Sequence, residues 1–169
     1  MRGSDSRKWL ANHFGTTQKN IDNVLRDEKA TTFLLIWPIM EQELFDGFMK
    51  NDHIESKAAE LEKYYERLDL DTIIEAFWRR YQDKDNFRHL LHKDKNGSVT
   101  SMIKQILSTP LSNLNNKEKL ELLLFIIYRY RNNIFHGNKG VLSWTKYSEQ
   151  INSCIFAMTR LIDIQKQEC

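Results

Sequence analysis

The hydrophobic pattern of the chain is helical along most of its length. Apolar side chains recur three and four residues apart, which is the spacing of the core-facing stripe of an amphipathic helix. Phe33, Trp37, Met40 and Leu44 follow this spacing within residues 30–50. No segment has the sustained alternation of apolar and polar residues that is typical of a half-buried strand. The sequence therefore predicts an all-α fold.

Capping residues and a proline mark the expected helix bounds. Thr17 is a suitable N-cap, and Asn115 followed three residues later by Glu118 is typical of a capping box. Pro38 removes a backbone donor inside a long helix and predicts a kink there. The expected helices cover residues 6–14, 17–27, 30–50, 56–68, 83–92, 98–108, 115–131 and 143–167, with one more, capped by Asp69 or Asp71, that contains Ile73, Ile74, Phe77 and Trp78.

Apolar side chains cover every face of the helix predicted over residues 115–131. A helix that is apolar all round lies at the centre of a fold, enclosed by the others. We therefore expect an up-down helical bundle with additional helices, in which this helix is the most enclosed. The expected core side chains are Phe33, Trp37, Leu123, Ile127, Ile155 and Met158, with Trp144, Ile151 and Ile162 also facing inward.

Length and composition narrow the class of protein. A chain of 169 residues, 41% hydrophobic and 28% charged, is expected to form a single domain over residues 1–169. The net charge of +2 gives no overall attraction for nucleic acid, so RNA contact requires a local basic patch. Cys154 and Cys169 form no disulfide framework, and residues 33–40 are too short an apolar run to span a membrane. With no signal peptide recognised, we expect a cytoplasmic protein.

Candidate chemistry is concentrated at the end of the central helix, where residues 131–137 read Arg-Asn-Asn-Ile-Phe-His-Gly. The Arg131 guanidinium can hold a phosphate through its fixed fork of donors. The His136 imidazole can transfer a proton near neutral pH, and the Asn132 amide can orient either partner. These are the groups that RNA cleavage without a metal ion needs.

At Arg131, Asn132 and His136 the chain resembles the HEPN superfamily, small all-helical domains of bacterial toxins, defence systems and RNA-processing enzymes. The resemblance implies a four-helix core, a homodimer that brings two motifs together, and metal-independent endoribonuclease activity in many members. Other members only bind nucleotides or proteins. HEPN toxins silenced by an adenylylating antitoxin carry a tyrosine two residues after the histidine, and this chain departs from them there with Asn138.

Helical geometry leaves the arrangement of the motif open. At about 100° per residue, Asn132 and His136 share a face, whereas Arg131 points about 140° away from His136. Either the helix ends or distorts near Asn133, or Arg131 reaches round, or the site is completed across a dimer. The predicted substrate-binding side chains are Arg129, which lies on the His136 side, Asn133 and Lys139.

Other interpretations of the same residues remain. Gly137 can be a left-handed helix cap, with His136 near the terminal carbonyls and Arg131 paired with an acid such as Glu41 or Glu43. Lys139, Lys146, Arg79 and Arg80 form either a basic groove or an ordinary solvated face. His89 and His92 have the spacing of metal ligands on a helix, but nothing completes a site, so we predict no metal and no cofactor.

Two functions follow. The first is a metal-independent endoribonuclease that cleaves RNA by 2′-hydroxyl attack, as a homodimer whose interface passes close to His136, in a toxin–antitoxin or phage-defence setting with an antitoxin or effector protein as partner. The alternative is a non-catalytic HEPN-like bundle that binds nucleotide, RNA or a protein partner, or that mainly dimerises within a larger defence or toxin complex. Arg131 and His136 in one open cleft would favour the enzyme.

Overall fold

The computed structural model describes residues 3–91, 97–135 and 146–168. The fold is all-α, as predicted, with no strand in these residues. The helices are α1 (Gly3–His13), α2 (Gln18–Leu25), α3 (Glu28–Phe45), α4 (His53–Leu61), α5 (Tyr65–Leu68), α6 (Asp71–Arg80), α7 (Lys84–Leu91), α8 (Gly97–Ser108), α9 (Asn116–Phe135) and α11 (Ser148–Glu168), with 3-10 turns at Glu62–Tyr64 and Leu111–Asn113.

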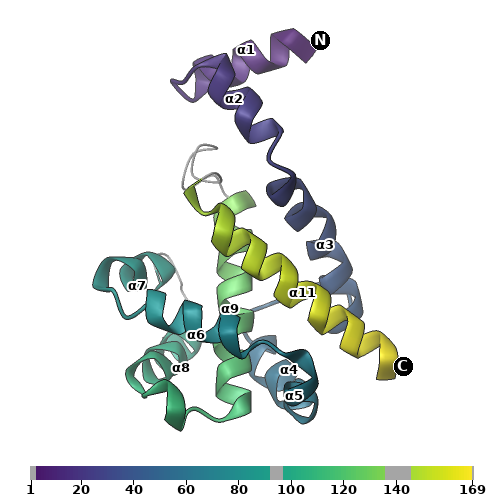
Figure 1. Cartoon of the computed structure of the whole chain (residues 1–169), viewed down its shortest axis with the longest axis vertical. Coiled ribbons are helices and arrows are strands. Elements are labelled where there is room, and N and C mark those ends of the chain that lie inside the picture. Colours follow the sequence, from purple (N-terminus) through teal and green to yellow (C-terminus); the bar gives the residue numbers. More distant parts are fainter. Residues whose placement is uncertain (1–2, 92–96, 136–145, 169) are drawn as a thin grey trace.

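The central helix α9 is enclosed, as its apolar pattern predicts. Every residue of 120–127 is buried, and α4, α6 and α8 pack against this helix (Figure 1). The expected core residues Phe33, Trp37, Leu123, Ile127 and Met158 are buried. The prediction for Ile155 is wrong, because this side chain lies at the margin of the core and is only partly buried.

Helix α3 is shorter than predicted at its C-terminal end. It begins after Asp27, whose carboxylate accepts a hydrogen bond from the Lys29 N–H at 3.0 Å, and it continues through Pro38. It ends at Phe45, with the left-handed Asp46 (φ 52°) as its C-cap, so Phe48 falls outside the helix, and its side chain is exposed. No helix in the described part of the chain is long and apolar enough to cross a lipid bilayer.

The capping predictions are confirmed at two helices and wrong at a third. Thr17 caps α2, and Asn115 and Glu118 exchange hydrogen bonds of 2.9 and 2.8 Å at the start of α9. Neither Asp69 nor Asp71 caps α6. The left-handed Asp69 ends α5 instead, and the Asp71 carboxylate accepts the Tyr65 hydroxyl at 2.6 Å, which is the main reason that its pKa lies below the ordinary value.

Helices α1 and α2 form a hairpin beyond the N-terminal end of α3 (Figure 1). We call residues 3–26 the arm. Gly15 permits the turn with φ +61°, and an ion pair of 3.0 Å between Arg7 and Asp22 joins the two helices. The buried hydrophobic residues of the arm, Ala11, Ile21 and Val24, do not belong to the main core, so the arm is an appendage of the bundle.

Helices α3 and α11 run in the same direction and pack along each other. The Lys29 ammonium donates to the Ser148 hydroxyl at 2.9 Å at one end of the pair. At the other end, Lys166 and Glu43 form an ion pair of 3.5 Å. This pair positions Trp37, on α3, beside the end of α9.

Candidate functional site

Helix α9 carries the motif and extends to Phe135, four residues beyond the predicted end. Asn133 therefore lies within the helix, while the position of His136, on which the choice among the three arrangements depends, lies outside the described residues. The buried ring of Tyr130 packs against Phe77 of α6, with centroids 6.3 Å apart. This tertiary packing gives a reason for the helix to continue through a stretch with polar residues at 131–133.

Arg131 is held against α3. Its guanidinium carbon lies 5.5 Å from the centroid of the Trp37 ring, and its Nη1 donates a hydrogen bond of 2.9 Å to Oδ1 of Asn132. A planar guanidinium is attracted to the face of an indole ring, and a partly buried contact of this kind is stronger than an exposed one. The geometry thus brings Arg131 and Asn132 together and fixes the direction of the arginine.

The other predicted side chains differ in their access to solvent. Arg129 is buried, with 8% of its surface exposed, and Asn133 is partly buried. Lys139 and the predicted proton-transfer group His136 lie outside the described residues, as do Asn138, Trp144 and His92. The structure therefore describes four of the predicted site residues, all on the last turns of α9: Arg129, Arg131, Asn132 and Asn133.

A second group of side chains surrounds Tyr147, and the sequence did not predict that these side chains meet. The Arg80 guanidinium carbon and the Lys146 ammonium lie 5.6 and 5.7 Å from the centroid of its ring. The ring of Tyr147 also meets that of Tyr130 edge to face, at 6.4 Å. We call Arg80, Lys146 and Tyr147 the Tyr147 cluster. It brings two cations that are far apart in the sequence together beside the C-terminal part of α9.

Buried hydroxyl and thiol groups lie near this cluster. Tyr81 and Tyr130 share a hydrogen bond, and burial raises the pKa of Tyr81 to about 12 and that of Tyr130 well above its usual range. Burial also raises the pKa of the Cys154 thiol. These groups are therefore neutral at neutral pH, and Cys154 lacks the thiolate character of a reactive cysteine.

The acids considered as partners of Arg131 have other contacts. Oε1 of Glu41 accepts a hydrogen bond from the Met49 N–H at 3.1 Å, and Glu43 is paired with Lys166 on α11. Arg79, a candidate for the basic groove, pairs with Glu75 one turn away on its own helix. Of the predicted groove residues that the structure describes, Arg80 and Lys146 are thus the two that converge.

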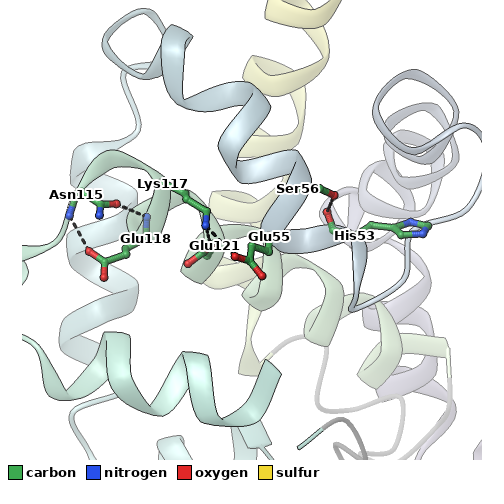
Figure 2. A network of polar contacts seen from close by, with 7 residues as sticks. All are labelled: His53, Glu55, Ser56, Asn115, Lys117, Glu118 and Glu121. Atoms are coloured by element: carbon green, nitrogen blue, oxygen red, sulfur yellow. Dashed lines mark hydrogen bonds and ion pairs between the residues drawn. The ribbon is translucent and has the colours of Figure 1, made fainter. Parts of the chain in front are cut away.

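A cavity of about 540 Å³ lies near the other end of α9. The Lys117 ammonium on its wall is 3.0 Å from Oε1 of Glu55 and 3.3 Å from Oε1 of Glu121 (Figure 2). Asp52 and Glu118 also line the cavity. Because these acids outnumber Lys117, the cavity would repel the phosphates of RNA. The sequence signal for this group was a single acid, Glu121, inside an apolar run.

Glu121→Gln is expected to change the free energy of unfolding, relative to the wild type, in a pH-dependent way. The change should favour the variant more at neutral pH than in acid. Burial raises the pKa of the Glu121 carboxyl above its ordinary value of 4.5, so the folded wild type loses stability as the pH rises from that value through the raised pKa. An amide has no such titration and can still accept a hydrogen bond from Lys117. Urea unfolding of both proteins at about pH 4 and pH 7 measures the difference. An advantage of the variant that shrinks as the pH rises would contradict this assignment.

Comparisons with models of protein families, with characterised proteins and with solved structures found no match for this chain. Within the described ranges, no group of three or more histidine, cysteine or acidic side chains has the arrangement of a metal site. The residues at the end of α9 are therefore the candidate site of this chain.

Proposed function

We propose that this protein is a metal-independent endoribonuclease of the HEPN type, with Arg131, Asn132 and His136 as its catalytic residues. The observation that carries the proposal is the position of Arg131, whose guanidinium is fixed by the Trp37 ring and the Asn132 amide on the turn that leads to His136. A charged donor held in place before the reaction stabilises developing negative charge more effectively than one that must be ordered during it.

The proposed reaction needs one base and one acid. His136 takes the proton from a ribose 2′-hydroxyl, and the 2′-oxygen attacks the adjacent phosphorus. The bond from phosphorus to the 5′-oxygen breaks, and His136 of the partner subunit protonates the leaving oxygen. Arg131 stabilises the charge on the non-bridging oxygens, while Asn132 holds the arginine in position. The products are a 2′,3′-cyclic phosphate and a 5′-hydroxyl.

The Tyr147 cluster supports RNA as the substrate. A chain with a net charge of only +2 needs a local patch to bind a polyanion, and Arg80 and Lys146 supply one beside the motif helix. Arg129, Asn133 and Lys139 would complete the contacts to phosphate. We propose a cytoplasmic homodimer that acts in a toxin–antitoxin or phage-defence setting, with its activity held in check by an antitoxin or effector protein.

A non-catalytic bundle that binds nucleotide, RNA or a protein is the second candidate. The burial of Arg129 favours it, because an arginine residue that is only 8% exposed offers little surface to a substrate. In this case the contact between Arg131 and Trp37 would serve to hold α9 on α3 rather than to place a catalytic group.

Incubation of the pure protein with mixed RNA in the presence of a chelator tests the proposal. We expect fragments with 2′,3′-cyclic phosphate and 5′-hydroxyl ends, because the 2′-oxygen is the nucleophile. Treatment of the fragments with a phosphatase that opens cyclic phosphates, followed by end mapping, identifies them. RNA or nucleotide binding with no cleavage would support the second function instead, and fragments ending in 3′-hydroxyl and 5′-phosphate would contradict the mechanism.

A further inference from the structure

Exposed large hydrophobic side chains are concentrated on two surfaces. Of the large hydrophobic side chains that are exposed in the described residues, Phe48 alone lies on neither surface. Soluble domains seldom expose several such side chains close together unless they contact another molecule. The first surface is the arm, with Trp9, Phe14 and Leu25, and the second lies on the paired helices α3 and α11, with Leu35, Ile39 and Phe156.

The arm has little core of its own. Its buried hydrophobic side chains within the described residues are Ala11, Ile21 and Val24, and these do not belong to the main core. An isolated helical hairpin with so few buried side chains is marginally stable in water. Its largest apolar group, Trp9, is 55% exposed. Packing of the arm on another apolar surface would therefore stabilise it.

The second surface is the outer side of the α3 and α11 pair, which we call the outer face. Leu35 and Ile39 lie between the two points where α3 is tied to α11, and Phe156 lies in the corresponding stretch of α11. Ile36 and Ile155, beside them in the sequence, are partly buried against the core. The outer face thus carries exposed apolar side chains from both helices of the pair.

The arm does not cover the outer face of its own chain. Figure 1 shows α1 and α2 beyond the N-terminal end of α3, pointing away from the body. Only Arg26 and Asp27 connect α2 to α3, and both are tied down, since the Arg26 N–H donates to the Asp22 carbonyl at 3.0 Å and Asp27 caps α3. An arm that lies beyond the end of its own α3 can reach the outer face of another molecule.

Charge complementarity identifies that molecule as a second copy of this chain. The arm has four basic residues, Arg7, Lys8, Lys19 and Arg26, against two acidic ones. The exposed charged residues of α3 and α11 are mostly acidic, namely Glu28, Glu43, Glu149 and Asp163, with Lys166. The two apolar surfaces therefore carry charges of opposite sign, as surfaces that bind each other do.

We propose that two copies pair by exchanging arms, each arm packing on the outer face of the other copy about a two-fold axis. The anchor of the arm is a set of packed rings, in which Trp9 stacks on His13 at 4.9 Å and His13 meets Phe14 edge to face at 5.0 Å. Two-fold symmetry makes the contact twice, so both arms and both outer faces are covered. The pairing does not depend on RNA cleavage.

Analytical ultracentrifugation over about 1 to 100 µM tests the proposal. The wild type is expected to dimerise, and Trp9→Glu in the arm or Phe156→Glu on the outer face should each lower the association constant at least about tenfold, because each change damages both contacts. Phe48→Glu is the matched control, since Phe48 is 54% exposed but lies on neither surface, and it should remain dimeric. Circular dichroism checks that the variants keep their helices.

Mixing the two variants distinguishes arm exchange from other dimers. A pair made of Trp9→Glu and Phe156→Glu chains has one contact between an intact arm and an intact outer face, whereas each variant alone has none. The mixture should therefore associate more tightly than either variant. A monomeric wild type, variants that stay dimeric like the control, or a mixture no tighter than its components would each overturn the proposal.

Discussion

His136→Ala is expected to lower the rate of RNA cleavage by about 10²- to 10⁴-fold, which is the usual contribution of a positioned acid or base. The proposed mechanism uses this imidazole twice, as base in one subunit and as acid in the other. Its loss therefore removes both proton transfers. The pH dependence of the wild-type rate should be bell-shaped, since one imidazole must be neutral and the other protonated.

Single-turnover cleavage of a labelled RNA measures the effect of His136→Ala. His89→Ala is the matched control, because His89 is an exposed histidine on α7 and its removal should leave the rate unchanged. Undiminished cleavage by the His136 variant would rule out the proposed base, and equal losses in both variants would point to a general effect on the fold.

Arg131→Ala is expected to lower the maximal rate by about 10²- to 10³-fold, with a smaller change in the RNA concentration at half-maximal rate. In the proposed mechanism Arg131 acts on charge that develops in the transition state, so its loss should affect the chemical step more than binding. Arg131→Lys should recover only part of the rate, because an ammonium lacks the planar fork that both stacks on Trp37 and donates to Asn132.

Arg79→Ala is the control for Arg131→Ala, since it also removes one positive charge but from a residue paired with Glu75 on α6. It should cleave RNA at the wild-type rate. If Arg131→Ala did the same while remaining folded, the arginine would have a structural role and the non-catalytic function would gain support. A dimer of one Arg131→Ala chain and one His136→Ala chain keeps a single His136, so partial recovery of activity on mixing would indicate that the two residues serve one site from different subunits.

Local signals predicted the helices well, because a helix depends on residues close together in the sequence. The apolar run at 120–127 predicted the enclosed helix, and the Asn115 and Glu118 pair predicted its cap. Predictions failed where a neighbouring element decides the outcome. Ile155 follows the helical spacing but lies at the margin of the core, and Asp71 bonds Tyr65 instead of capping its helix.

The candidate site could be predicted only in part, for the same reason. Arg131 and Asn132 were identified from their order in the motif, and Trp37 was expected only as a core residue. Arg131 and Trp37 are almost a hundred positions apart in the sequence. Hydrophobic periodicity is a local signal, so it cannot predict a contact between residues so far apart. The meeting of Arg80 and Lys146 at Tyr147 is likewise tertiary, as is the position of Glu121 beside Lys117 and Glu55.

The parallel pairing of α3 and α11 has a consequence for biosynthesis. The bond between Lys29 and Ser148 joins residues 119 positions apart, and closing so long a segment is slow compared with forming local helix contacts. Since the ribosome makes the N-terminus first, α3 is made well before α11 can pair with its Lys29 and Glu43 side chains. Until then the side of α3 that faces α11 is open to chaperones and to other nascent chains, so the emergence of α11 from the ribosome is the step that closes the bundle.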